Sequence, residues 1–207
     1  MIKNQVMTAS VSVIDMFRRW EHEADEEWSE FVDRLSAPQT PQMACGAAFH
    51  KALENTTGEG EIPTLESGGF LFEFSQFDGE LPLGNLREIS TSKMYGPLLV
   101  RGRADEVSGN TVTDYKLTFG SFDAERYLDS YQWRFYLDMM GLDGFTYQVF
   151  EGYENFESGA IDVKKLHSLK LYRYPQLGDD CQKLAKRFHD VALRHPQIAK
   201  IRNESEL

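Results

Sequence analysis

Residues Pro97 to Leu117 read PLLVRGRADEVSGNTVTDYKL and predict a β-hairpin. The pair Gly109-Asn110 suits a two-residue loop between antiparallel strands, because both residues tolerate positive φ angles. The flanking residues alternate between apolar and charged or hydroxyl side chains, as in half-buried strands. This hairpin belongs to a β-rich middle part of the chain.

A two-residue loop fixes which residues of the hairpin lie opposite one another. Ser108 would pair with Thr111, and the same count places Asp105 directly opposite Asp114. Because side chains alternate along a strand, Asp114 and Lys116 share one face. That face also carries Arg101, Arg103 and Asp105, whereas the expected core face carries Val100, Gly102, Ala104, Thr113, Tyr115 and Leu117.

Two carboxylates that face each other at roughly 5 Å repel one another. A structural protein would avoid or neutralise such a pair, whereas a hard divalent cation such as Mg²⁺ binds carboxylate oxygens. Lys116 beside that cation would orient or polarise an attacking water and stabilise charge on a phosphate. Taken alone, the hairpin also suits a polar face held by ion pairs, and a β-bulge would break its register.

The elements around the hairpin predict an α/β (α+β) domain with a central mixed β-sheet flanked by helices. Periodicity, caps and helix breakers predict helices at residues 11–35, 40–54, 121–140 and 179–195. The second helix has Thr40 as its cap and Pro41 at its first position, and it ends near Gly58. The third begins at Ser121 or Asp123 and stops at Gly141, and Asp179 caps the last. Short aromatic or β-branched runs predict strands at residues 68–74, 86–94, 145–150 and 168–174.

The 207 residues are interpreted as one domain, with a core at about residues 40–175 and the first and last helices as elaborations. The chain is 41% hydrophobic and 27% charged, as in soluble globular proteins. It has no apolar run of the ~20 residues that a membrane helix needs, and MIKNQVMTAS has no signal-peptide pattern. Cys45 and Cys181 are too few for a disulfide framework or a cysteine-rich metal site, which predicts two reduced packing residues in a cytosolic protein.

The net charge of −11 argues by itself against nucleic-acid binding. The charge is uneven, however: residues 164–202 contain ten Lys and Arg against three Asp and Glu, a net of +7 that leaves −18 on the rest. Much of the negative charge lies in EHEADEEWSE at residues 21–30. The pattern suits a solvated acidic helix face and a basic last helix. It equally suits a DNA-facing side that carries Lys183, Lys186 and Arg187.

Four short motifs follow one another along the chain: GAAFHKALE at Gly46–Glu54, GRADEV at Gly102–Val107, TDYK at Thr113–Lys116 and SYQWRFY at Ser130–Tyr136. Each is weak alone, because a pattern such as Asp-x-Lys is common. In this order, on a predicted helix, hairpin and helix, they resemble the RecB-like branch of the PD-(D/E)xK nuclease superfamily. The resemblance spans Gly46 to Tyr136 and implies a restriction-endonuclease-like core.

The resemblance implies a metal centre with Mg²⁺ or Mn²⁺. The carboxylates of Asp105 and Asp114 would bind the ion. The imidazole of His50 and the backbone carbonyl of Tyr115 would be further ligands. Lys116 would position the hydrolytic water. Gln132 and Tyr136 would line the cleft. Glu54 and Glu88 are candidates for outer ligands or for groups behind the ligands, and Arg101, Arg103, Arg126 and Arg134 are candidates for binding phosphate. Each also has a plain structural interpretation, as a helix-packing residue, a solvated charge or an ion-pair partner.

The resemblance implies a stand-alone nuclease that cleaves DNA, more plausibly as an exonuclease of phage recombination or DNA repair than as an endonuclease. Ala104 stands where the family often has proline, a frequent departure in this branch, and two cysteines exclude the iron–sulfur cluster of some members. The alternative is an inactive domain of the same fold that binds DNA or a protein partner. DNA is the expected partner, with a single-strand annealing or recombination protein and a further copy of the chain as additional candidates. The expected location is the bacterial cytoplasm, with a phage gene as one candidate source.

Overall fold

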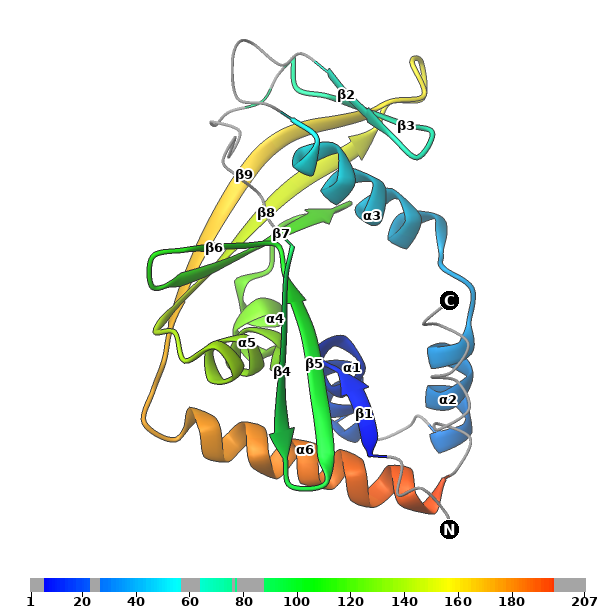
Figure 1. Ribbon diagram of the computed structural model, residues 1–207. Helices are drawn as coiled ribbons and strands as arrows, with labels where there is room; N and C mark the ends of the chain where they lie inside the picture. Colours follow the sequence, from blue (N-terminus) through cyan, green and yellow to red (C-terminus); the bar gives the residue numbers. More distant parts are fainter. Residues whose placement is uncertain (1–5, 23–26, 57–63, 76, 78–87, 196–207) are drawn as a thin grey trace.

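The computed structural model describes residues 6–22, 27–56, 64–75, 77 and 88–195 (Figure 1). The predicted mixed α/β class is confirmed, because β-sheets with both parallel and antiparallel strand pairs are flanked by helices. The predicted central sheet is divided into two, and the division runs through the charged hairpin. Within the described ranges, no helix is long and apolar enough to cross a membrane.

The two sheets differ in size. Among the described residues, the smaller has β5 (Leu98–Ala104) between the parallel strand β1 (Met7–Ser10) and the antiparallel strand β4 (Ile89–Tyr95). The larger runs in the order β2 (Thr64–Ser67), β3 (Phe70–Glu73), β9 (Ile161–Tyr172), β8 (Gly144–Glu154), β7 (Thr111–Thr118) and β6 (Glu106–Ser108). The predicted strands at residues 145–150 and 168–174 are parts of the long antiparallel pair β8 and β9.

The hairpin register is confirmed only next to its turn. Ser108 pairs with Thr111 and Glu106 with Thr113, as the two-residue loop requires. Beyond Glu106 the prediction is wrong, because Asp105 forms a bend and the preceding strand β5 pairs with β4 and β1 instead of β7. The Asp105 carboxylate accepts a hydrogen bond from the backbone N–H of Tyr115 at 2.8 Å. A side chain thus takes the place of a strand partner, and Asp105 reaches the neighbourhood of Asp114 without being its cross-strand partner.

The predicted helix at residues 11–35 is wrong in its extent, because two helices occupy it: α1 (Val11–His22) and α2 (Trp28–Ser36). Glu27 precedes α2 with an extended backbone, φ −69° and ψ 151°. Its N–H donates to Glu30 Oε2 at 3.1 Å, which satisfies a donor at the helix start. The acidic run therefore contains the beginning of a second helix.

The third predicted helix is also two helices, α4 (Ala124–Asp129) and α5 (Gln132–Met140). Asp123 caps the first with its side chain, and Gly141 with φ 69° ends the second, both as predicted. The interruption lies at Ser130, where ψ is 141°. An extended residue at this position separates α4 from α5 and gives α5 a start of its own.

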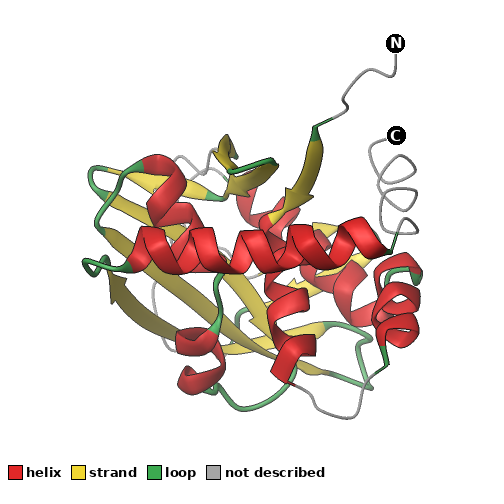
Figure 2. Cartoon of the chain, turned by 90° about the horizontal axis from the view of Figure 1, so that it is seen from below, coloured by secondary structure: helices red, strands yellow, loops and turns green. Residues whose placement is uncertain are grey.

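The remaining helices follow the prediction more closely. α3 (Pro41–Glu54) begins with the Thr40 hydroxyl accepting from Met43 N at 3.2 Å, while the expected stop near Gly58 lies outside the described residues. α6 (Leu177–Arg194) begins before Asp179, which therefore lies in the first turn and is not the cap. A carboxylate in that turn still favours the helix through its dipole. Seen from below, α6 crosses in front of the strands (Figure 2).

Two cores lie on opposite faces of β7. The first joins α1, α5 and α6 to the sheets, with Phe17, Val100, Ala104, Val112, Phe145 and Phe188. The second lies against α3, with Phe49, Phe72, Tyr115, Phe150 and the partly buried Leu117. The predicted single core face is wrong, since the bend at Asp105 sends the apolar residues of β5 to the first core and those of β7 at odd positions to the second. Cys45 and Cys181 are buried and unpaired, one in each core.

Candidate active site

A cavity of about 750 Å³ lies between α3, the start of α1, the bend after β5, β7 and α5. Ten of the sequence-predicted residues line it: His50, Glu54, Glu88, Arg101, Arg103, Asp105, Asp114, Lys116, Gln132 and Tyr136. They come from elements far apart in the sequence. Tertiary packing therefore assembles the site, and the hairpin contributes only its centre.

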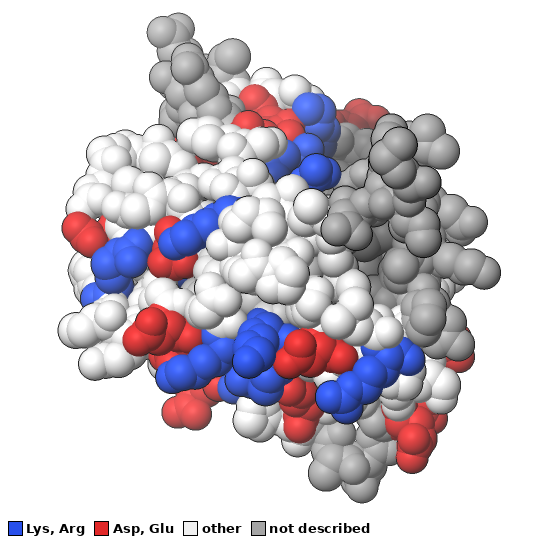
Figure 3. Space-filling view, turned by 60° about the horizontal axis from the view of Figure 1, so that its bottom comes forward, with Lys and Arg blue, Asp and Glu red and all other residues white. Residues whose placement is uncertain are grey.

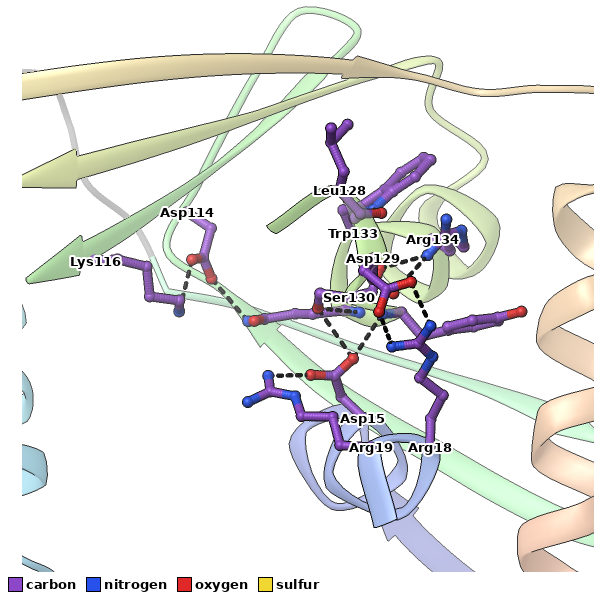
Figure 4. Close-up of polar contacts among 12 residues, drawn as sticks. Asp15, Arg18, Arg19, Asp114, Lys116, Leu128, Asp129, Ser130, Trp133 and Arg134 are labelled. Carbon is purple, nitrogen blue, oxygen red and sulfur yellow. Dashed lines mark hydrogen bonds and ion pairs between the residues drawn. The ribbon is translucent and has the colours of Figure 1, made fainter. Parts of the chain in front are cut away.

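Asp114 and Lys116 share one face of β7, which confirms the predicted alternation. Lys116 Nζ lies 2.6 Å from Asp114 Oδ2, and Gln132 Nε2 donates to Asp114 Oδ1 at 2.9 Å (Figure 4). Burial raises the pKa of Asp114 above its ordinary range, although the Lys116 ammonium acts against it. Burial also acts to lower the pKa of Lys116, but the carboxylates of Asp114 and Asp105 outweigh it and raise that pKa. Lys116 is consequently a cation held beside a buried acid.

Asp105 and His50 meet at the other side of this pair. His50 Nδ1, on α3, lies 3.4 Å from Asp105 Oδ2, the oxygen that also accepts from Tyr115 N. Burial acts to raise the pKa of Asp105, but His50, Lys116 and the Tyr115 N–H outweigh it and hold the pKa below its ordinary value. Asp105 is therefore ionised at neutral pH, as a metal ligand must be.

The donor groups fit a divalent cation, although they are not assembled around one. Within the described part of the chain, no three His, Cys, Asp or Glu side chains are placed to hold an ion together. The buried Asp114 Oδ2 contacts Lys116 Nζ outside hydrogen-bond geometry and makes no hydrogen bond among the described residues. Such an oxygen keeps lone pairs that a bound cation would use. Carboxylate oxygens, an imidazole nitrogen and a backbone carbonyl together suit Mg²⁺ or Mn²⁺.

Tyr136 fixes the strand that leads into the bend. Its hydroxyl donates to Arg103 O at 2.8 Å and accepts from Arg103 N at 3.2 Å. Tyr136 is 4% exposed, and its ring packs against Gly102, which has no side chain. Tyr136 thus connects α5 to β5 and fixes the backbone two residues before Asp105.

Replacing Gly102 by alanine is expected to destabilise the protein by about 1–3 kcal/mol, the usual cost of overpacking. A Cβ there would lie 2.7 Å from Tyr136 Cε1 and 3.1 Å from Met139 Cε. Gly46→Ala is the matched control, because no described atom beyond its chain neighbours and its own helix backbone lies within 4 Å of its Cβ position and alanine favours a helix interior by about 0.5–1 kcal/mol. Urea denaturation should show opposite shifts for the two variants. Equal stability of Gly102→Ala and the unsubstituted protein would contradict the close packing.

The two predicted supporting acids line the same cavity and are each paired with a cation. Lys51 Nζ lies 2.6 Å from Glu54 Oε2, and Arg103 Nη1 lies 2.8 Å from Glu88 Oε2. Burial and the neighbouring Glu54 raise the pKa of Glu88. Their place behind the ligands therefore remains a prediction, with Lys51 as a cavity-lining cation that the sequence did not single out.

Arg126 and Arg134 lie away from the large cavity. Arg126 lines a second cavity of about 150 Å³, which shares Lys116 and Gln132 with the first. Arg134 Nη1 donates to Ser130 O at 2.6 Å, and its guanidinium stacks over neighbouring rings. Arg134 thus has a packing role, whereas Arg126 faces a space next to Lys116.

The basic residues of α6 line neither of these cavities. Lys183 Nζ lies 3.6 Å from Asp180 Oδ1, and Arg187 Nε lies 3.0 Å from Glu21 Oε1. Basic and acidic side chains alternate on the lower face of the molecule (Figure 3). Contact between DNA and Lys183, Lys186 and Arg187 stays a prediction.

Sequence reasoning missed two buried polar residues beside the site. Asp15 is 4% exposed and Ser130 is 6% exposed, and both belong to the network drawn in Figure 4. The signal for Asp15 was an acid inside the apolar stretch from Val13 to Phe17, because a buried carboxylate needs partners. Ser130 gave a weaker signal, as the first residue of the SYQWRFY motif.

Comparison with known proteins supports the fold. The sequence matches no family model and no curated protein. The crystal structure of SSO0001 is similar, with a TM-score of 0.52 and 16% identity over 90% of this chain and 76% of that chain. The fold is thus similar to that of SSO0001. The crystal structure of LHK-Exo in complex with dAMP matches with a TM-score of 0.41 and 11% identity, over 98% of this chain and 93% of that chain. Identities this low assign no activity, so function rests on the site itself.

Proposed function

We propose that this protein is a metal-dependent nuclease that hydrolyses phosphodiester bonds in DNA. The observation that carries the proposal is the convergence of His50, Asp105, Asp114 and Lys116 on one cavity, in the roles that the PD-(D/E)xK resemblance implies. Carboxylates for a hard cation and an ammonium for a phosphate are the groups that this hydrolysis needs. The proposed substrate is therefore a phosphodiester of a DNA strand, which would bind in the cavity of about 750 Å³.

The side chains of the site would divide the work. His50, Asp105, Asp114 and the carbonyl of Tyr115 would hold the cation, which when bound would polarise a phosphate oxygen and lower the pKa of a water. Lys116 would orient the attacking water and stabilise charge on the phosphate. Gln132 holds Asp114 Oδ1, so Oδ2, which Lys116 Nζ contacts at 2.6 Å, is the oxygen that would bind the ion.

DNA would reach the site through cations that line the cavity, because a chain with net charge −11 needs a local basic surface. Lys51, Arg101, Arg103 and Lys116 line the cavity, and a phosphate would bind in competition with the acids that pair with Lys51, Arg103 and Lys116. The choice of an exonuclease in phage recombination or repair, and of an annealing protein or a second copy as partner, rests on the family resemblance. These finer assignments belong to the proposal.

A catalytically inactive DNA-binding domain is the second candidate. The observation that favours it is the contact between Lys116 and Asp114 at 2.6 Å, since an ammonium in that position can neutralise the acid without any metal. Such a domain would retain DNA in the cavity and leave it intact. The two candidates therefore differ in a single measurable property, which is metal-dependent loss of DNA.

The test uses the purified full chain and end-labelled duplex and single-stranded DNA. Mg²⁺ or Mn²⁺ should support degradation and excess EDTA should stop it, whereas Ca²⁺ should bind without supporting turnover. Release of mononucleotides or short products from the ends would indicate an exonuclease. Binding without degradation under every metal condition would favour the inactive domain. Degradation that persists in excess EDTA would overturn the metal mechanism.

A further inference from the structure

A buried carboxylate from α1 holds the junction between α4 and α5. Asp15 Oδ1 accepts hydrogen bonds from Tyr131 N at 2.6 Å and from Ser130 Oγ at 3.0 Å, and Arg19 Nη2 donates to Asp15 Oδ2 at 2.5 Å (Figure 4). The serine lies 115 residues from Asp15 in sequence. A buried carboxylate with three donors is satisfied, so Asp15 is a fixed point in the fold.

These contacts supply the cap of α5. The first N–H groups of a helix have no partner within it. Asp15 satisfies Tyr131 N, and the Ser130 hydroxyl, which Asp15 orients, accepts from Gln132 N at 3.1 Å. Tyr131 precedes α5, and its side chain makes no capping hydrogen bond to the helix. The start of α5 is therefore set from outside, by α1.

Gln132 carries this restraint to the proposed site. It is the first residue of α5, and its side-chain amide donates to Asp114 Oδ1 at 2.9 Å. A helix start that shifts would move this amide with it. Asp15 itself does not line the large cavity, and at 4% exposure it cannot touch a substrate.

We propose that Asp15 is a positioning residue, which fixes the start of α5 so that Gln132 holds the Asp114 carboxylate in its reacting orientation. The kinetic part of this inference rests on the proposed nuclease function. The structural part, from Asp15 to Gln132, does not. The experiment therefore has one arm that needs activity and one that does not.

A second tether provides a matched control. The two terminal guanidinium nitrogens of Arg18, Nη1 and Nη2, pair with the carboxylate of Asp129 at the end of α4; Arg18 is also on α1. This contact joins the same two parts of the fold. It ends on α4, however, and the Asp129 side chain is 61% exposed. Asp129→Asn weakens a tether between α1 and the junction without touching the cap of α5, because it removes the charge and one of the two acceptor oxygens that Arg18 binds.

The first arm follows the Gln132 side-chain amide by NMR in the full chain, without metal or DNA. Asp15→Ala should shift or broaden that amide resonance, because the cap of α5 is lost. Asp129→Asn should leave it in place, and so should Asp15→Asn, since asparagine keeps the acceptor oxygen. An unchanged Gln132 amide in a folded Asp15→Ala protein would overturn the proposal. If that variant does not fold, Ser130→Ala takes its place with the same expected result.

The second arm measures DNA cleavage. Asp15→Ala should lower kcat about tenfold to a hundredfold with KM nearly unchanged, because misplacement of a reacting group by about an ångström costs that much. Asp15→Asn should recover most of the rate, and Asp129→Asn should equal the unsubstituted protein. In a Gln132→Ala background the Asp15 substitution should cost little more, because both act on one contact. Additive losses would overturn the positioning role. If no variant cleaves DNA, including the unsubstituted chain, the proposed function fails while the NMR arm still decides the structural part.

Discussion

Replacing Lys116 by alanine is expected to lower kcat for DNA cleavage by about 10³-fold, at the upper end of what one preorganised charge contributes to a transition state. The ammonium is held against Asp114 at 2.6 Å on the cavity wall. The two carboxylates keep it charged, because they raise its pKa above the ordinary range. Alanine removes that charge and the group that would orient water. Single-turnover cleavage of end-labelled DNA measures the effect.

Metal affinity should respond differently to the same substitution. Removing a cation next to Asp114 should leave binding of Mn²⁺ unchanged or tighter, as a calorimetric titration would show. Lys165→Ala is the control, because this lysine lies on β9, which β8 separates from β7, has a side chain 63% exposed and does not line the cavity. A Lys116→Ala protein that cleaves at the unsubstituted rate would refute the assigned role.

Local sequence signals predicted the local structure. Thr40 caps α3 and Gly141 ends α5, because each role depends on residues within one helical turn. The Gly109-Asn110 turn set the register of β6 and β7 for the same reason. Alternation within β7 then placed Asp114 and Lys116 on one face. Each of these predictions needed only neighbouring residues.

Long-range contacts decided what the sequence could not show. Whether the strand before Asp105 continues the hairpin or joins another sheet depends on β1 and β4, and nothing within the hairpin reports on them. The break at Ser130 depends in the same way on Asp15, which is far away in sequence. The helical pattern alone favours a continuous helix there. Both differences arise where a distant partner outweighs local preference.

The candidate site was predicted in composition more than in geometry. The motif resemblance brought His50, Gln132 and Tyr136 together with the hairpin acids, and all of them line one cavity. The contacts that these residues make depend on the bend at Asp105 and on the cap of α5 at Ser130 and Asp15. Tyr136, expected to line the cleft, also binds the backbone of Arg103. The basic residues of α6 line neither cavity. The sequence could not show this, because net charge along a segment does not say which way the side chains of a helix face.

Asp114→Asn is expected to abolish cleavage and the thermal stabilisation that a divalent cation gives. A neutral amide is a poor ligand for Mg²⁺ or Mn²⁺, and Asp114 supplies the one buried oxygen in the site without a hydrogen bond among the described residues. A ligand that binds only the folded state at 100 times its Kd adds about 2.7 kcal/mol of stability. The Tm of the unsubstituted protein should therefore rise with Mn²⁺, while that of the variant should not.

The comparison is made within each variant, with and without Mn²⁺, because the substitution itself changes the metal-free protein. Removing the charge of Asp114, the buried partner of this ion pair, leaves Lys116 with only the Asp105 carboxylate among the described residues to offset its charge, which lowers stability whatever the role of the metal. Asp162→Asn on β9 is the control, since its carboxylate lies outside the cavity, and it should gain as much Tm from Mn²⁺ as the unsubstituted chain. A Tm increase that survives in Asp114→Asn would show that the ion binds elsewhere. No increase in any of the three proteins would favour Lys116 as the permanent partner of Asp114 and, with it, the inactive DNA-binding domain.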